Sequence, residues 1–126
     1  MQLVRQLLSF GSVGMVATVV HVALAYVLML QTATSPFLAN LAGFLAAFGI
    51  SFFGNAKLTF GYDGSLTGPM VRFLAISFVS LTLTSGITAL VEAQGLPRWT
   101  YVVLTLATVP PITFLLAKFW VFAVRD

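Results

Sequence analysis

The chain has 126 residues, of which 60% are hydrophobic and only 7% are charged, and its net charge is +3. Because a soluble domain carries about 25% charged residues, this composition excludes a soluble globule and predicts a membrane protein. The absence of cysteine excludes disulfides and thiolate chemistry. The few basic residues lie near the ends of apolar runs, which does not indicate a nucleic-acid-binding protein.

Four apolar segments follow one another along the chain. A bilayer core of about 30 Å requires about 20 mostly apolar residues in a spanning helix, and each segment meets this length. Glycine, proline and polar turn residues separate the segments. The sequence therefore predicts an all-α integral membrane bundle of four transmembrane helices in a single domain, residues 1–126. The helices are expected at about residues 7–30, 37–60, 70–91 and 99–122.

The basic residues predict the orientation in the membrane. With the N-terminus in the cytoplasm, only Arg98 falls on the outer side and every other basic residue falls on the inner side. The inner set is Arg5, Lys57, Arg72, Lys118 and Arg125. Because basic residues accumulate on the cytoplasmic side, we expect both termini in the cytoplasm.

The two halves of the chain look alike. Residues 51–60 and 113–122 both contain a hydroxyl residue, an aromatic residue, a lysine near the membrane surface and a closing phenylalanine. The first and third segments share a weaker start at Arg5 and Arg72. This pattern predicts two tandem helical hairpins, related by an axis along the membrane normal.

Ionisable residues inside the predicted spans are rare. His21 is the clear case, and it is either a neutral histidine bonded to a neighbouring helix or a proton or headgroup contact. Asp63, Glu92 and Asp126 all lie outside the middle of the membrane. The lack of a buried acid argues against a proton-driven antiporter such as a small multidrug-type transporter.

The second segment carries a small or polar residue at every fourth position from Gly43 to Asn55. Such a stripe allows close helix packing. The role of Asn55 has two interpretations: its amide caps a neighbouring helix, or it binds a phosphate together with Lys57. Pro110 and Pro111 near the middle of the fourth segment predict a kink or break, since both remove a backbone donor.

The role of the inner basic residues also has two interpretations. They can set topology and attract anionic lipid heads, at about 1 kcal/mol each. Alternatively, Lys57 and Lys118 converge on one phosphate and Arg72 joins them. The sequence contains no catalytic constellation and no metal-binding motif, so we expect neither an enzyme nor a cofactor.

Over nearly its whole length the chain resembles the GtrA-like family of small four-helix membrane proteins. The resemblance is carried by Arg5 with residues 8–14, by residues 52–60, by Arg72-Phe73 and by residues 114–122. In the second of these segments, the family pattern is asparagine, a basic residue, any residue, an aromatic residue, threonine and phenylalanine, which corresponds to residues 55–60 here. Here Ala56 replaces the basic residue and Leu58 the aromatic one, whereas the fourth segment keeps Lys118 and Trp120. A phosphate role is therefore less secure for Lys57 than for Lys118.

The resemblance implies translocation of a polyprenyl-phosphate-linked sugar, typically undecaprenyl-phosphate glucose, across the bacterial cytoplasmic (inner) membrane. Membrane glycosyltransferases then use the sugar to modify surface polysaccharide. The expected partners are this lipid-linked sugar, membrane lipids, a glycosyltransferase and further copies of the chain. Four helices with axes about 8–10 Å apart leave no interior for a headgroup, which favours a homo-oligomer or a surface groove. A non-transporting scaffold for a glycosyltransferase is the main alternative.

Overall fold

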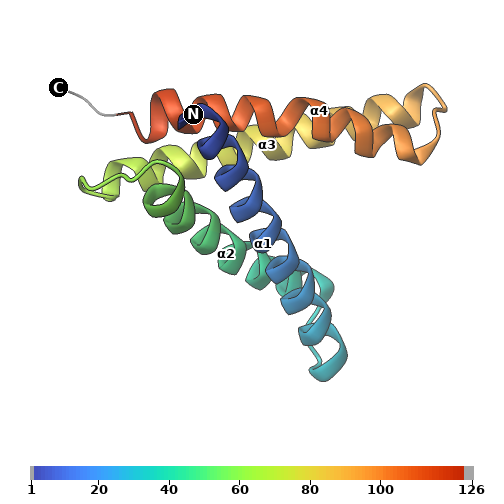
Figure 1. Ribbon diagram of the computed structural model, residues 1–126. Coiled ribbons are helices and arrows are strands. Elements are labelled where there is room, and N and C mark those ends of the chain that lie inside the picture. Colours follow the sequence, from blue (N-terminus) through green and yellow to red (C-terminus); the bar gives the residue numbers. More distant parts are fainter. Residues whose placement is uncertain (1, 124–126) are drawn as a thin grey trace. The chain divides into compact units, whose positions relative to one another are not determined.

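The computed structural model describes residues 2–123, and these form four long helices. The helices are α1 (Gln2–Gln31), α2 (Pro36–Gly54), α3 (Thr67–Ala93) and α4 (Arg98–Leu116) (Figure 1). The π-helical turns η1 (Asn55–Thr59) and η2 (Ala117–Val121) continue α2 and α4. All four spans are long and apolar enough to cross a membrane, which confirms the predicted all-α membrane class. The first helix begins at Gln2 rather than near Leu7, and Arg125 lies outside the described residues.

Local chemistry explains where the helices begin and end. Ser35 caps α2 by accepting a hydrogen bond from the backbone N–H of Leu38 at 3.2 Å, and Pro36 occupies the first helical position. Gly61 and Gly95 follow the ends of the second and third spans with φ values of +57° and +63°. Glycine adopts this left-handed conformation without steric cost, so both helices stop there.

The described residues fall into two compact units that divide between Asp63 and Gly64. Hairpin 1 consists of α1, α2 and η1, and hairpin 2 consists of α3, α4 and η2. We call the end of a hairpin where its first helix begins and its π turn lies the open end. Two similar units are what a tandem duplication would produce; the single domain predicted from the sequence stays a prediction.

Hairpin 1 is held by a close approach between its two helices. A Cβ atom added at Gly43 would lie 2.6 Å from Cδ2 of His21 and 2.7 Å from its carbonyl oxygen. Farther along, a Cβ at Gly54 would lie 2.8 Å from a methyl carbon of Val13. Ala17, Ala25 and Ala39 are buried along the same hairpin. The small-residue stripe predicted in the second segment is therefore a helix-packing surface.

Hairpin 2 is held at its open end by larger apolar side chains. Phe73, Ile76, Phe114 and Phe122 are buried there, and the rings of Phe73 and Phe122 lie 6.1 Å apart. Of the kink or break predicted at Pro110 and Pro111, the break is wrong, since α4 continues through both residues, and the kink stays a prediction. The hydroxyl of Thr113 donates to the carbonyl oxygen of Val109 at 2.9 Å within this stretch.

Both second helices widen into a π turn before they end. The backbone N–H of Phe60 donates to the carbonyl oxygen of Asn55, and that of Phe122 donates to that of Ala117, both at 2.9 Å. These are bonds between residues five apart, as in a π helix, and such turns occur frequently at functional sites. The two hairpins therefore share a local backbone feature that the sequence pattern alone does not indicate.

The contact between Gly43 and His21 predicts that Gly43→Ala destabilises hairpin 1. The new methyl group meets a backbone oxygen, which cannot move unless the helices separate, so we expect a loss of about 1–3 kcal/mol in unfolding free energy. Unfolding of the purified protein by titration with a denaturing detergent, followed by circular dichroism, measures this quantity.

Gly49→Ala is the matched control, because a Cβ atom at Gly49 meets nothing within 4 Å. Alanine is the better helix former, so this variant should be unchanged or slightly more stable. Equal effects of the two substitutions would show that the close approach at Gly43 does not hold the hairpin.

Candidate functional site

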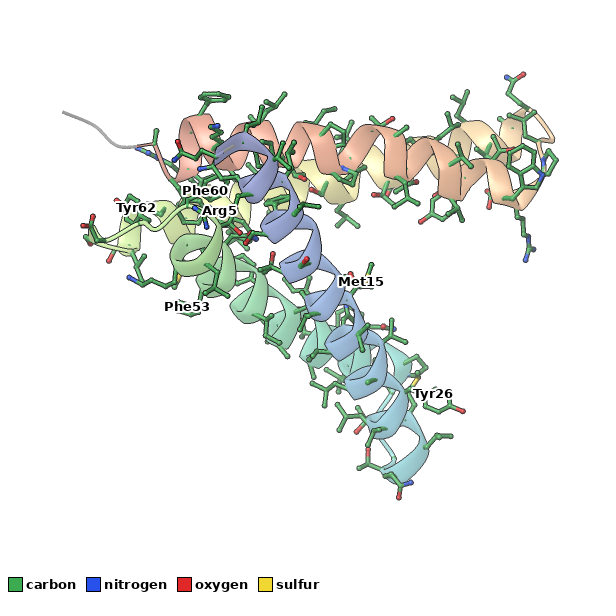
Figure 2. All side chains as sticks on the ribbon, in the orientation of Figure 1. Arg5, Met15, Tyr26, Phe53, Phe60 and Tyr62 are labelled. Carbon is green, nitrogen blue, oxygen red and sulfur yellow. The ribbon has the colours of Figure 1, made fainter. Side chains whose placement is uncertain are left out.

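The open end of each hairpin carries an arginine that donates to its π turn. Nη1 of Arg5 lies 3.4 Å from the carbonyl oxygen of Leu58, and Nη1 of Arg72 lies 3.1 Å from that of Trp120. Leu58 and Trp120 are each the fourth residue of their turn. Figure 2 shows Arg5, Phe60 and Tyr62 at the open end of hairpin 1. The same arginine-to-carbonyl bond in both units supports the tandem repeat inferred from the sequence.

Lys118 is a cation at the open end of hairpin 2 that is available to a ligand. Its ammonium lies 5.5 Å from the centre of the Phe119 ring, and within residues 2–123 it has no hydrogen-bond partner. Arg72 is more committed, because it bonds the Trp120 carbonyl and lies 5.9 Å from the centre of the Trp120 ring. The open end of hairpin 2 thus presents one ammonium with uncommitted donors and one guanidinium held by η2.

Lys57 in hairpin 1 differs from Lys118 in its place on the turn. Lys118 is the second residue of η2, whereas Lys57 is the third residue of η1 and Ala56 occupies the second position. Lys57 is exposed and its ammonium donates to the carbonyl oxygen of Tyr62 at 3.2 Å. The two lysines are therefore one residue out of register between the hairpins.

Asn55 is fully buried and both ends of its amide are used within hairpin 1. Nδ2 donates to the carbonyl oxygen of Ser51 at 2.8 Å, and Oδ1 accepts from the hydroxyl of Thr59 at 2.7 Å. Thr59 is in turn 2.8 Å from the hydroxyl of Ser9 on α1. Both bonds of the Asn55 amide stay within its own span and do not cap a neighbouring helix, and a phosphate role for Asn55 stays a prediction.

His21 lies against Gly43 and is half-buried. Among residues 2–123 its imidazole has no hydrogen-bond partner, so the neutral histidine bonded to a neighbouring helix is not what this structure contains. Its position explains why glycine stands opposite it. A proton or headgroup role for His21 stays a prediction.

Hairpin 2 also contains a set of hydroxyl side chains that the sequence analysis missed. They are half-buried on α3 and recur at intervals of three or four residues, so they follow one side of the helix. We call this set the hydroxyl stripe: Ser77, Ser80, Thr84 and Thr88. Its spacing was visible in the sequence, but the high hydropathy of the segment concealed it.

Three of the four stripe hydroxyls donate to the carbonyl oxygen four residues earlier. Ser77, Ser80 and Thr88 make these bonds at 2.9–3.0 Å. A hydroxyl has one proton and two lone pairs, so the oxygens remain free to accept hydrogen bonds. On α4, the Thr105 hydroxyl oxygen is buried and has no partner among the described residues.

The convergence of Lys57, Arg72 and Lys118 on one phosphate stays a prediction, because Lys57 belongs to hairpin 1 and the other two to hairpin 2. Hairpin 2 by itself places Arg72, near the start of α3, and Lys118, in η2, at the same open end. Phosphate accepts strong charge-assisted hydrogen bonds from such groups. This end of hairpin 2 therefore has the chemistry to bind a phosphate.

Comparison with known proteins identifies the family. Bactoprenol-linked glucose translocase of Shigella phage SfX is 32% identical over 117 residues, which cover 90% of this chain and 91% of that protein. The prophage bactoprenol-linked glucose translocase homolog of Escherichia coli K12 matches with the same identity and coverage. No solved structure matches. The family described as GtrA/DPMS, transmembrane domain, matches residues 9–122, which include most of both hairpins, and the chain belongs to this family.

Proposed function

We propose that this protein moves a polyprenyl-phosphate-linked sugar, such as undecaprenyl-phosphate glucose, across the bacterial cytoplasmic membrane. Two relatives that align over nine-tenths of the chain are named translocases for bactoprenol-linked glucose. The observation within this chain that carries the proposal is Lys118, a half-buried residue at the end of a membrane span whose ammonium has uncommitted donors. A charge in that position is costly to keep unless it binds something.

In the proposed mechanism, Lys118 and Arg72 hold the lipid phosphate at the open end of hairpin 2. Arg72 keeps its guanidinium in place through the Trp120 carbonyl and still has further N–H donors. Lys118 supplies a mobile point charge beside it. The lipid chain stays in the bilayer, because its hydrocarbon gains nothing by entering the protein.

The hydroxyl stripe provides a polar route for the headgroup past the apolar core of the membrane. Sugar hydroxyls are hydrogen-bond donors, and the stripe oxygens are acceptors spaced about one helical turn apart along α3. Each exchange of a water for a stripe hydroxyl lowers the cost of moving the sugar through a low-dielectric region. The stripe thereby replaces part of the hydration that the headgroup loses.

The proposal assigns binding and movement to this chain and no bond-making chemistry. Between residues 2 and 123 the acidic residues are Asp63 in a loop and Glu92 near the end of α3. A buried acid that could couple transport to protons is thus missing from these spans, and the substrate gradient drives the movement. A glycosyltransferase that consumes the sugar outside, together with further copies of this chain, completes the proposed system.

The proposed orientation places the open ends of both hairpins and both termini in the cytoplasm. We therefore expect an impermeant maleimide added to whole cells to label Gln94→Cys and not Ser65→Cys. Both positions are exposed, and the natural chain has no cysteine to confuse the result. Labelling of Ser65→Cys should appear only after the membrane is permeabilised. Labelling at Ser65→Cys but not at Gln94→Cys in intact cells would reverse the orientation.

Transport by the purified protein tests the function itself. Liposomes that contain the protein and undecaprenyl-phosphate glucose should expose the inner-leaflet glucose to an impermeant oxidant faster than protein-free liposomes do. Removing two stripe hydroxyls in Ser80→Ala/Thr84→Val should slow this exposure about tenfold, because each lost hydrogen bond is worth about 0.5–1.5 kcal/mol.

Ser12→Ala/Thr18→Val on α1 is the matched control. These hydroxyls also donate to the carbonyl four residues earlier, at 2.7 and 2.9 Å, but they are exposed and lie outside the stripe. This double variant should transport at the wild-type rate. If the wild-type protein moves no lipid, the scaffold alternative holds; if both double variants are equally slow, the stripe is not the route.

A further inference from the structure

The two hairpins differ in chemistry at positions that are otherwise equivalent. Alignment of the π turns pairs Asn55 with Ala117 and Thr59 with Val121, and alignment of Arg5 with Arg72 pairs Gln6 with Phe73 and Ser9 with Ile76. Gln6 and Phe73 are each 6% exposed. Hairpin 2 therefore builds the same turn from apolar side chains where hairpin 1 has polar ones.

The polar residues of hairpin 1 are consequently not required for folding the turn. Thr59 is 0% exposed and Val121 only 1%, so the two environments bury their side chains equally well. Valine at such a place has no hydroxyl to satisfy, whereas every buried polar group needs a partner. A polar set at the open end of hairpin 1 calls for another explanation than packing.

The hydrogen bonds in this set have a defined direction. The carbonyl oxygen of Ser51 can only accept, so the atom of Asn55 facing it is Nδ2 and the atom facing Thr59 is Oδ1. Thr59 therefore spends its single proton on Asn55. Because the Ser9 hydroxyl lies 2.8 Å from that of Thr59, Ser9 must be the donor between them. The half-buried Ser9 oxygen is left with only acceptor capacity.

Gln6 adds a second acceptor beside Ser9. It lies three residues before Ser9, on the same face of α1. Its Oε1 atom is buried and has no hydrogen-bond partner in the described part of the chain. A buried, unpaired carbonyl is costly, and hairpin 2 avoids that cost with Phe73. The amide is thus retained at a position where an apolar side chain fits.

The charges nearby select the kind of donor that can satisfy these acceptors. Arg5 and Lys57 both lie at this open end, held by the carbonyl oxygens of Leu58 and Tyr62. Two cations repel a ligand ammonium and attract an anion. The fitting ligand therefore carries uncharged hydroxyl donors next to a negative group, which is the chemistry of a sugar on a phosphate.

We propose that Gln6 and Ser9 form a recognition site for the hydroxyl groups of the transported sugar. This inference rests on the proposed function and deepens it, since it assigns sugar selectivity to the open end of hairpin 1 as a binding place of its own. There Arg5 and Lys57 meet the phosphate of the lipid, separately from Arg72 and Lys118 of hairpin 2. Nothing in this assignment requires Gln6 for binding the phosphate or the lipid chain. We therefore expect that replacing Gln6 or Ser9 reduces the protein's discrimination between lipids with and without a sugar.

The test compares the affinities of the detergent-solubilised protein for undecaprenyl-phosphate glucose and for undecaprenyl phosphate. Wild type should prefer the glucosylated lipid, and Gln6→Leu should reduce that preference about two- to tenfold, as expected for one lost neutral hydrogen bond. Affinity for undecaprenyl phosphate should stay within about twofold. Ser9→Ala should reduce the preference in the same direction.

Gln2→Leu is the matched control, because Gln2 is an exposed glutamine on the same helix. It should keep the wild-type preference. The melting temperature of each variant is measured alongside, and Gln6→Met, which has a similar length and no amide, replaces Gln6→Leu if that variant does not fold. At least one of Gln6→Leu and Gln6→Met should fold, because hairpin 2 accommodates the apolar Phe73 at the equivalent position.

Three outcomes overturn the inference while leaving the proposed function standing. The first is a wild-type protein that binds both lipids equally. The second is a Gln6 variant that changes neither affinity. The third is a Gln6 variant that binds both lipids more weakly and has a lower melting temperature, which is the behaviour of a merely structural residue. If wild type binds neither lipid, the proposed function fails as well.

Discussion

In the hydrocarbon of a membrane, every backbone N–H and C=O group must find its partner inside the protein. This chain departs from α-helical pairing where α2 and α4, the second helices of the two hairpins, end. There η1 and η2 close with bonds between residues five apart. Arg5 and Arg72 each supply a guanidinium to a carbonyl oxygen of such a turn. The same bonds fix cations at the open end of each hairpin, so the need to satisfy the backbone also builds the surface that can meet a phosphate.

Repetition of this device in two hairpins makes each a comparison for the other. Hairpin 1 uses a close glycine contact and a buried Asn55–Thr59 bond, whereas hairpin 2 uses Phe73 packed on Phe122. Polar side chains at the turn of hairpin 1 and hydroxyls along α3 of hairpin 2 are therefore not demands of the shared fold. A duplicated scaffold that keeps its backbone bonds and diverges in side chains can take on separate recognition tasks in its two copies.

The sequence predicts the features that depend on local pattern. Hydropathy locates the spans, and the spacing of small residues from Gly43 locates a helix-packing face, because both follow from helix geometry alone. The π turns were not predictable from the local pattern, and their bonds with Arg5 and Arg72 join residues 53 and 48 positions apart, which only coordinates show. The burial of Asn55 and the direction of its hydrogen bonds needed coordinates for the same reason. Of the kink or break predicted at Pro110 and Pro111, the break does not occur, because a helix in a membrane can continue through prolines when nearby groups satisfy the freed carbonyls.

The most direct measurement is the binding of undecaprenyl phosphate and of uncharged undecaprenol to the detergent-solubilised protein, in wild type, Lys118→Gln and Arg98→Gln. Lys118 lies at the proposed phosphate end of the fourth span, whereas Arg98 begins α4 at the opposite end. The account predicts that wild type prefers the phosphate and that Lys118→Gln weakens phosphate binding more than tenfold, from about 2–5 kcal/mol for a desolvated charge pair. Arg98→Gln should bind like wild type. Equal binding of undecaprenol and undecaprenyl phosphate by the wild-type protein would contradict the account.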